Sequence, residues 1–477
     1  MSSTKNSESE SGQNKFEKII ETGGHEIKKY VDRIDTKVEG GIEKMPHPIK
    51  KVSQGAQVVA REAVGLIVLP YKKRRSILDY FWKSKHGVIT GAADNDPSGI
   101  VTYTQTGAIA GFRLLWLCLL AWPLLTIVES MSARIGVVTK KGITAVIGEN
   151  YGKSWAYLVT LVVLVCNTIT MGADIAAMSD IAAILSGISE LIFVVVFGLL
   201  FFYLLWKHGY KTISNYLFIL TPIFLLYIAS AFLLPVPWGQ ALRDTVLPSF
   251  QSMNLDFILI AVAFLGTTLT PALIFWETSQ EIEEGKTVGD LKKENMGVAA
   301  GMFFSQFITF FIIVAAAAAF AGDNHIIGSA REAALSLKPI GNGSFLFFSL
   351  GILGSGMLSV PVISASTAYM ISETFGWRKG LDKTLHQAKG FYAVIIMTLL
   401  VSGTIAFFNF NPILALIYSQ VLAGLLMPIL LVFLILITNN KKIMGPYTNR
   451  IFSNIFGILA ILMMVGADVA LIYQWLR

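Results

Sequence analysis

The chain has 477 residues, of which 54% are hydrophobic and only 14% are charged, and its formal net charge is +7. This composition is typical of a polytopic membrane protein and excludes an ordinary soluble domain. The positive charge does not indicate nucleic-acid binding, because the basic residues lie between apolar runs. The sequence contains no nucleophile–histidine–acid arrangement, P-loop or dinucleotide motif, so we expect no enzyme and no cofactor.

Residues 1–83 are expected to form a cytoplasmic N-terminal extension. The first fifteen residues are rich in Ser, Glu, Lys and Asn and predict disorder. The stretch Val58–Leu69 is apolar but too short to span a bilayer, and a basic cluster follows it at residues 72–75. Such segments form amphipathic helices on the inner leaflet or remain a solvated tail, and the sequence leaves both alternatives open.

The rest of the chain contains eleven apolar stretches near the length of roughly 20 residues that a spanning helix needs. They cover residues 86–111, 114–138, 154–185, 190–206, 212–234, 255–279, 297–321, 344–373, 390–408, 412–437 and 452–475. The prediction is therefore an all-α protein with about eleven transmembrane helices. Residues 84–437 would form a transporter core of ten helices, and residues 438–477 would add a loop and an eleventh helix.

The basic residues predict the orientation of these spans. With the N-terminus in the cytoplasm, nearly all Lys and Arg residues fall in cytoplasmic segments. The exceptions are Arg113, Arg243, Arg331, Lys338 and Arg477. This asymmetry follows the positive-inside rule. We therefore expect a multi-pass protein of the cell membrane with a cytoplasmic N-terminus and, because the helix number is odd, an extracellular C-terminus.

The first span contains the sequence Asp-Asn-Asp-Pro-Ser-Gly at residues 94–99. Proline removes an amide donor and bends or breaks a helix. Unwound backbone is tolerated at bilayer depth only where it faces protein or a water-filled cavity, and an intramembrane carboxylate indicates a functional site. The segment therefore predicts a broken helix whose carbonyls and aspartates bind a cation.

The sixth span contains a second break, Gly-Thr-Thr-Leu-Thr-Pro-Ala at residues 266–272. Two interrupted helices five spans apart indicate an inverted-repeat transporter with its site at the midplane. Two proline kinks in ordinary packed helices are the alternative. The candidate ligands from the breaks are the Asp96 carboxylate, the carbonyls of Ala93 and Thr267, the Thr270 hydroxyl, and Gly99 as a source of space or of a carbonyl.

Further residues are candidates for a second shell or for the pathway. Asp94 would hold the ion's waters or face a neighbouring helix, and Glu277 lies seven residues after Thr270, on a similar helical face. Asp174 in the third span lines the pathway or bonds locally. Gln420 in the tenth span would orient a water.

Several motifs resemble the NRAMP family of divalent-metal transporters over residues 84–437. The residues concerned are Asp96-Pro97-Ser98-Gly99 in the first span, Ala133–Thr139 ending the second, Asp174-Ile175-Ala176 in the third, and Ser419-Gln420-Val421 followed by Met427-Pro428 in the tenth. The resemblance implies the leucine-transporter-type fold, with helices 1–5 and 6–10 as inverted repeats and helices 1 and 6 broken.

The departures from the family pattern bear on the substrate. Gly99 stands at the place of the family's metal-binding asparagine, and Thr270-Pro271-Ala272 replaces Met-Pro-His. Glu277 and Ala177 stand at the places of a histidine and a glutamate, and the ninth span lacks the arginine of proton-coupled members. A methionine thioether is a soft ligand, so its loss removes a preference for manganese and iron over magnesium. Magnesium prefers oxygen ligands and dehydrates reluctantly, which suits a roomy oxygen site.

The sequence therefore predicts a transporter of divalent metal cations, Mg²⁺ above all and also Mn²⁺, that works by alternating access without proton coupling. The pattern resembles the NRAMP-related magnesium transporters. A proton-coupled Mn²⁺ or Fe²⁺ transporter is the first alternative, and an organic-substrate carrier of the same fold is the second. The expected partners are the metal ion and the lipid bilayer, with no nucleic acid and no obligate protein partner.

Overall fold

The computed structural model describes residues 91–476, except 92, 209–211, 214–215, 217–220, 250–253, 321–325, 335–343 and 409–410. The chain divides into two compact units, Met1–Trp82 and Lys83–Arg477, and the described residues all belong to the second. The predicted N-terminal extension at residues 1–83 therefore lies outside them. Every regular element among the described residues is a helix.

Within this part of the chain, nine helices are long and apolar enough to cross a membrane. They are α6 (Leu115–Thr139), α8 (Lys153–Ser186), α9 (Glu190–Lys207), the pair α13 (Leu255–Thr268) and α14 (Pro271–Glu283), α15 (Leu291–Phe320), α17 (Ser344–Phe375), α18 (Lys389–Phe407), α19 (Pro412–Asn439) and α21 (Ile451–Trp475). These correspond to nine of the eleven predicted spans, with ends that differ by a few residues.

The other two predicted spans, 86–111 and 212–234, lie partly outside the described residues. Their described parts include α5 (Pro97–Ala110) in the first and α11 (Leu225–Leu233) in the second. The remaining elements are the short helices α7 (Ile143–Asn150), η1 (Thr221–Phe224), α12 (Trp238–Val246), α16 (Ala330–Ala333), α20 (Lys441–Met444) and η3 (Gly445–Tyr447).

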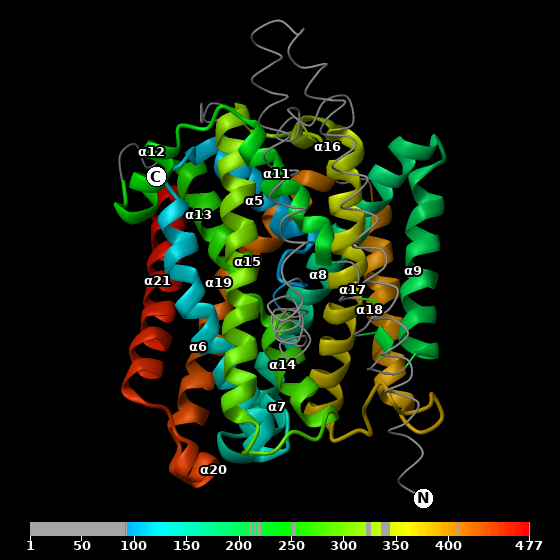
Figure 1. Cartoon of the computed structure of the whole chain (residues 1–477). Coiled ribbons are helices and arrows are strands. Elements are labelled where there is room, and N and C mark those ends of the chain that lie inside the picture. The colour runs from blue at the N-terminus through cyan, green and yellow to red at the C-terminus, as the bar shows by residue number, and fades with distance from the viewer. Residues whose placement is uncertain are drawn as a thin grey trace, which may run out of the picture. The chain divides into compact units, whose positions relative to one another are not determined.

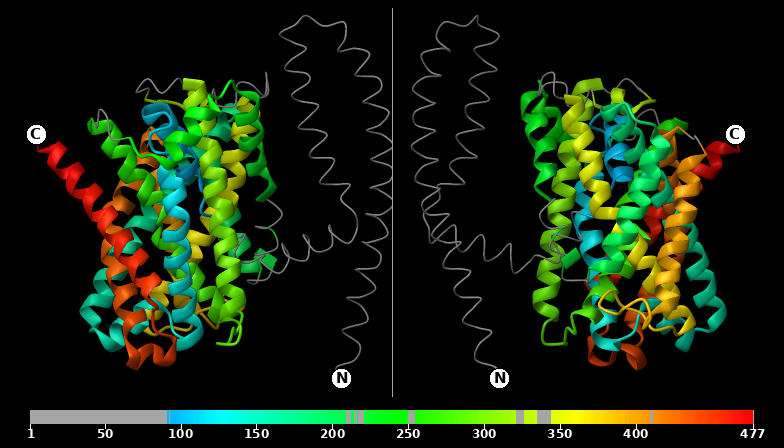
Figure 2. Two further views of the ribbon diagram at one scale, coloured as in Figure 1. Left: turned by 60° about the vertical axis from the view of Figure 1, so that its left-hand side comes forward. Right: turned by 90° about the vertical axis from the view of Figure 1, so that its right-hand side faces the viewer.

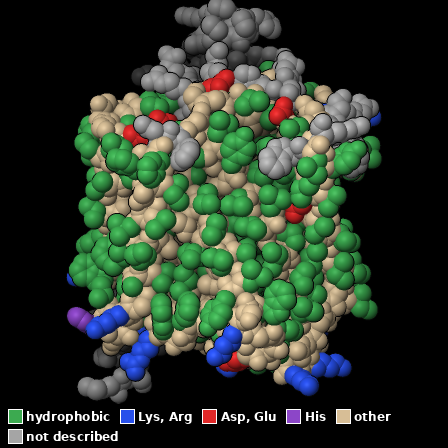
Figure 3. Space-filling model, turned by 180° about the vertical axis from the view of Figure 1, so that it is seen from behind, with side chains coloured by type: hydrophobic (Ala, Val, Ile, Leu, Met, Phe, Trp, Pro, Cys, Tyr) green, Lys and Arg blue, Asp and Glu red, His purple; other side chains and the backbone are tan. Residues whose placement is uncertain are grey.

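The long helices run side by side as a bundle, with α5 and α8 inside it and α9 and α21 at its edges (Figure 1). The C-terminal end of α21 leans away from the other helices (Figure 2). A belt of apolar side chains covers the middle of the surface, and lysine and arginine side chains gather at one end of it (Figure 3). This is the surface that a bilayer-spanning protein needs, since lipid must contact only apolar groups at mid-depth.

Helix α5 lies at the centre of the bundle, and all of its side chains are buried. It packs against α15, α13 and α19, while α14 packs against α6 and α17. The first half of the sixth span approaches α19 very closely at Gly266. A Cβ atom there would lie 1.9 Å from the Gln420 carbonyl oxygen, so only glycine permits this contact. Because α5 also packs directly against α13 and both are buried at the breaks, the two interrupted helices meet in the core rather than at the lipid surface.

Candidate functional site

The first helix breaks where the sequence predicts it. Ala93 is still helical, residues 94–96 are irregular, and α5 begins at Pro97. Proline suits this position because its missing N–H would have no intrahelical partner there. The Asp96 side chain caps the new helix, with its Oδ1 accepting a hydrogen bond from the backbone N–H of Gly99. A carboxylate offers about four lone-pair sites on its two oxygens, so Oδ1 can accept this hydrogen bond and still face a ligand.

The second break lies between α13, which ends at Thr268, and α14, which begins at Pro271. Leu269 and Thr270 link the two halves in extended or irregular conformations. Thr270 is half-buried and its side chain makes no capping hydrogen bond. Its hydroxyl is therefore not committed to the helix that follows.

Oxygen atoms from the two breaks converge beside Gly99. A Cβ atom built on Gly99 would lie 3.0 Å from Asp96 Oδ1, 3.1 Å from Thr267 Oγ1 and 3.3 Å from the Asp94 carbonyl oxygen. Thr267 comes from the sixth span and the other two residues from the first. A carboxylate, a hydroxyl and a carbonyl thus surround one point at which the two broken helices meet.

Two further carboxylates are buried next to this point. Asp174 on α8 accepts hydrogen bonds from the Ser98 hydroxyl (2.6 Å) and the Ser98 backbone N–H (3.2 Å) through its Oδ1. Asp94 Oδ2 accepts from the Ser305 hydroxyl on α15 at 2.5 Å. Asp174 lies close enough to Asp96 for their charges to repel each other. A cation between them would offset that repulsion.

Three oxygens at this place lack a hydrogen-bond donor among the described residues: Asp94 Oδ1, Asp174 Oδ2 and Thr267 Oγ1. All three side chains are at least 98% buried. A buried polar atom without a partner costs roughly 1–3 kcal/mol, and more when it is charged. Such atoms are available to a desolvated cation or to its waters.

The surrounding polar residues fix the backbone of the first break. Asn95 donates from Nδ2 to the Gly91 carbonyl and the Ser305 hydroxyl, each at 3.2 Å, and accepts from the Thr309 hydroxyl at 3.3 Å. Ser305 and Thr309 lie one turn apart on α15, so one helix face binds the unwound segment. Sequence reasoning missed Ser98, Ser305 and Thr309. The signal was a pair of hydroxyls four residues apart in an otherwise apolar helix.

The structure does not bring all predicted site residues to this point. Glu277 is buried further along α14, where its charge interacts with those of Glu129 and Glu281. The Gln420 side chain donates from Nε2 to the Ser419 hydroxyl at 3.2 Å. The backbone carbonyl of Gln420, rather than its side chain, faces Gly266 of the sixth span. Ala93 is buried directly before the unwound segment.

The site differs from a cage of acidic and imidazole ligands. Among the described residues, no three His, Cys, Asp or Glu side chains gather as a metal-binding group. A cation beside Gly99 would be held by few carboxylates and by neutral oxygens of the backbone and of hydroxyls. Mg²⁺ in proteins usually keeps several of its waters and takes only one or two carboxylates as ligands.

The sequence of this chain is similar to those of proteins named as metal transporters. The chain is 28% identical over 410 residues to the "Divalent metal cation transporter MntH" of Verminephrobacter eiseniae, covering 81% of this chain and 88% of that protein. Identity to the protein of the same name from Yersinia pestis is 27% over 409 residues, covering 81% and 94%.

Among solved structures, a mutant of the manganese transporter of Eremococcus coleocola matches with a TM-score of 0.68 at 16% identity, covering 82% of this chain and 87% of that one. A Na⁺-coupled sialic acid symporter matches with a TM-score of 0.54 at 13% identity, covering 81% and 89%. At these identities the matches establish the fold, which is the predicted leucine-transporter-type fold with its inverted repeats. The proteins matched are transporters, which confirms the expectation that the chain is not an enzyme.

The model of one protein family, described as natural resistance-associated macrophage protein-like, matches residues 87–474. This range includes both breaks and the carboxylates beside them, and it confirms the resemblance inferred from the motifs. The chain therefore belongs to the NRAMP family.

Proposed function

We propose that this chain carries divalent metal cations across a membrane, with Mg²⁺ as the main substrate and Mn²⁺ as a second one. The observation that supports this most is the oxygen-only convergence of Asp96, the Asp94 carbonyl and Thr267 beside Gly99. The names of its relatives, a divalent metal cation transporter and a manganese transporter, support the broader class of substrate.

The preference for magnesium is argued from the ligands that the two breaks offer. Neither residues 91–99 nor residues 266–272 contain a methionine, a cysteine or a histidine. Oxygen ligands favour hard ions such as Mg²⁺ and Ca²⁺, whereas thioethers favour softer transition metals. Mg²⁺ takes six ligands in an octahedron, so three protein oxygens leave room for waters. The predicted ligands Thr270 and the Ala93 carbonyl remain candidates for the other positions.

Transport without proton coupling is the second part of the proposal. Ala177 and Glu277 stand where the family resemblance implies a glutamate and a histidine, and α18 contains no arginine. The membrane potential alone would then drive entry. For a divalent ion it contributes about 4.6 kcal/mol per 100 mV, twice the single-charge value.

Buried glutamates support a path for the ion from the break toward the basic end of the bundle. Glu277 and Glu281 lie one turn apart on α14, and Glu129 on α6 interacts electrostatically with Glu277 and with Asp94. Helices α6 and α14 are in direct contact there, since Thr278 Oγ1 donates to the Ser132 carbonyl at 3.1 Å. We assign this column of carboxylates to the cytoplasmic half of the pathway.

An ion-pair network lies at the end of this column. Lys286, in the turn after α14, contacts Glu294 at 2.7 Å and Glu284 at 3.1 Å, and its carbonyl accepts from the Lys140 side chain. Burial opposes the charged form of Lys286, but the hydrogen bond to Glu294 and the nearby carboxylates outweigh it and raise the pKa of Lys286. The ammonium group therefore stays charged at neutral pH and keeps both ion pairs at the end of the column.

The test is transport by the full chain in liposomes, with Mg²⁺ influx and luminal pH recorded together. We expect Mg²⁺ influx that an inside-negative potential accelerates and that leaves luminal pH unchanged. Proton entry driven by Mg²⁺ would refute uniport, and no influx at millimolar Mg²⁺ would refute the substrate assignment. Asp468→Asn, which removes an intramembrane carboxylate on α21, is the control for nonspecific effects.

A proton-coupled manganese transporter is the alternative. Two observations favour it: the manganese transporter among the structural matches, and the buried carboxylates of Asp94 and Asp174, whose unpartnered oxygens could accept a proton. It predicts luminal acidification during Mn²⁺ entry in the same assay. The proposed orientation, with a cytoplasmic N-terminus and an extracellular C-terminus, is tested separately by labelling of single cysteines introduced at each end.

A further inference from the structure

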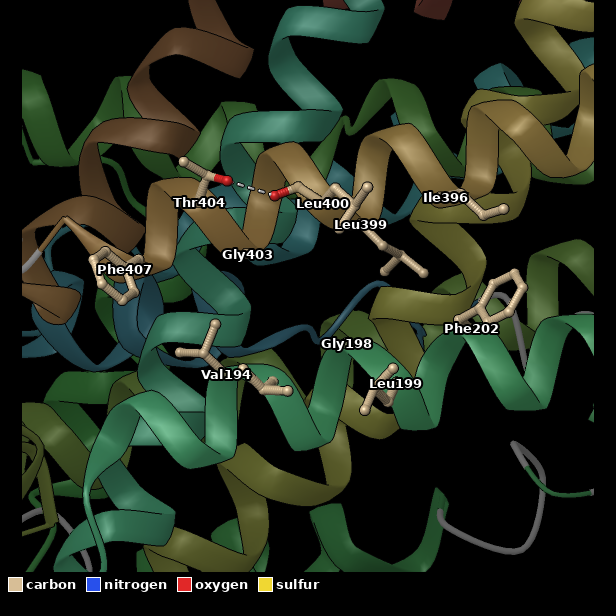
Figure 4. A pocket seen from close by; sticks show the side chains of 11 residues that line it. Val194, Gly198, Leu199, Phe202, Ile396, Leu399, Leu400, Gly403, Thr404 and Phe407 are labelled. Atoms are coloured by element: carbon tan, nitrogen blue, oxygen red, sulfur yellow. Dashed lines mark hydrogen bonds between the residues drawn. The ribbon is translucent and has the colours of Figure 1, made fainter.

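A groove on the side of the bundle contains no residue of either broken helix and has no role in the proposed transport. It has a volume of about 510 Å³ and lies between α9 and α18. Its lining side chains are hydrophobic except for Thr404, whose hydroxyl donates to the Leu400 carbonyl one turn earlier at 2.8 Å. Figure 4 shows Val194 and Phe202 of α9 facing Leu399 of α18 across this space.

Two glycines create the hollow. A Cβ atom on Gly198 of α9 would meet nothing within 4 Å, and one on Gly403 of α18 would meet only Val194, at 3.8 Å. Each helix therefore lacks a side chain at a place where one would fit, and the two places lie on opposite walls (Figure 4). The space is available to another molecule.

The molecule beside this groove in a bilayer is lipid. Helix α9 is a candidate membrane span, yet only 17% of its apolar window is buried by the rest of the protein. Val195, Leu199 and Leu400 on the rims of the groove are 60–64% exposed. Helix rise is about 1.5 Å per residue, so the wall from Val194 to Phe202 is roughly 12 Å long. This is close to the hydrocarbon depth of one leaflet, about half of 30 Å.

An apolar wall alone does not select a lipid, because lipid tails are as apolar as leucine and gain little by exchanging one such surface for another. Selection needs a headgroup contact. Lys389, the exposed first residue of α18, lies on the groove side of that helix, because it precedes Ile396 by seven residues, or close to two full turns and roughly 10 Å. Lys207, the last residue of α9, follows Phe202 by five residues, so it lies about 140° further round α9 and faces away from the groove.

We propose that this groove binds one acyl chain of an anionic phospholipid, with the lipid phosphate bound by Lys389. Under the orientation predicted from the basic residues, the lipid belongs to the inner leaflet. The negative charge of the headgroup matches the ammonium group of Lys389, and the chain lies along the glycines. Helix α18 in turn contacts α8, where Ser402 Oγ donates to the Thr168 carbonyl at 2.9 Å. The bound lipid would therefore support the helix that carries Asp174.

The experiment is native mass spectrometry of the full chain, released from detergent micelles that contain phosphatidylglycerol and phosphatidylcholine in equal amounts. We expect retention of phosphatidylglycerol in preference. The double variant Gly198→Leu/Gly403→Leu should lose the retained lipid. Lys389→Gln should weaken the preference for phosphatidylglycerol roughly fivefold, at about 1 kcal/mol for one lysine, whereas Lys207→Gln, on the other face of α9, should leave the preference unchanged.

Val196→Leu and Met397→Leu are the matched controls, since both residues are exposed on the same helices but do not line the groove. They should retain the lipid as the unmodified chain does. Equal retention of both lipids by the unmodified chain, or undiminished retention by the glycine variant, would overturn the proposal. A dimer that the glycine variant dissociates would overturn it too, because a second copy would then occupy the groove.

A phosphatidylglycerol with a photoreactive diazirine in its acyl chain gives an independent measurement that does not depend on the variants folding. Labelled peptides should map to α9 and α18, within residues 190–207 and 389–407. Labelling spread evenly over the exposed helices, α21 included, would contradict a specific site. Mg²⁺ influx by the same variants distinguishes this inference from the transport proposal, because loss of the lipid with transport retained affects only the groove.

Discussion

Replacing Asp96 by Asn and, separately, by Ala separates the two roles that the structure gives this side chain. Asp96 caps α5 through the backbone N–H of Gly99, and it is also the proposed ligand of the cation. Asparagine caps a helix about as well as aspartate, whereas alanine loses the cap, at about 1 kcal/mol (range 0.5–2). Neither variant carries the negative charge.

The two variants should therefore differ in stability and agree in transport. Asp96→Asn should unfold within a few tenths of a kcal/mol of the unmodified chain in metal-free buffer, and Asp96→Ala should be less stable by about 1 kcal/mol. Removing one partner of a buried charge pair typically weakens binding by about 2–5 kcal/mol. Both variants should thus lose Mg²⁺ affinity at least roughly 30-fold, at 1.4 kcal/mol per tenfold.

The assays are thermal unfolding without metal, Mg²⁺ binding by calorimetry, and Mg²⁺ influx into liposomes. Asp468→Asn serves as the matched control, because it also neutralises an intramembrane aspartate but on α21. If Asp96→Asn bound and transported Mg²⁺ like the unmodified chain, Asp96 would be a helix cap only. The site would then have to be sought elsewhere.

Three other substitutions test the surroundings of this residue. Gly99→Ala places a Cβ atom 3.1 Å from Thr267 Oγ1, and since overpacking costs about 1–3 kcal/mol we expect Mg²⁺ binding by calorimetry to weaken by roughly 5- to 140-fold; unchanged binding would refute a tight contact between the breaks. Thr270→Met adds a thioether to the second break and should raise Mn²⁺ influx relative to Mg²⁺ in competition, whereas an unaltered ratio would show that position 270 does not face the ion. Ser305→Ala removes the hydroxyl donor at 2.5 Å from Asp94 and should lower the free energy of unfolding by about 1.5–3 kcal/mol, measured by thermal unfolding. A loss of less than about 0.5 kcal/mol would show that water replaces the hydroxyl.

The position of both breaks could be predicted from the sequence because proline acts locally. Pro97 and Pro271 each begin the second half of an interrupted helix, as the loss of an amide donor requires. The spans could be predicted for a similar reason, since hydrophobicity over some twenty residues is a property of a continuous segment. Of the predicted site, Asp96 and Thr267 lie at the point where the two breaks meet.

The contacts between distant segments could not be predicted in this way. Asp174 binds Ser98, 76 residues earlier, and Asp94 binds Ser305, 211 residues later. No local pattern encodes such pairings, because they depend on which helix faces lie together in the bundle. The sequence also suggested the Thr267 carbonyl, whereas the structure brings its hydroxyl to Gly99. Gly99 was expected to supply space or a carbonyl, and three oxygens face the space that its missing side chain leaves.

The polarity of the helix ends explains why the aspartates are needed at this point. A helix N-terminus carries roughly half a positive charge and a C-terminus half a negative one. The N-termini of α5 and α14 lie at the breaks and repel a cation, and the C-terminal ends of α13 and of the helical turn that ends at Ala93 attract it, so the four helix ends roughly cancel. The net negative charge must therefore come from side chains. Asp96 supplies it at the N-terminus of α5 itself, where the positive end is nearest. For this reason the loss of its charge should weaken cation binding more than the loss of the neutral Thr267 hydroxyl, even though both oxygens lie within 3.1 Å of the same point.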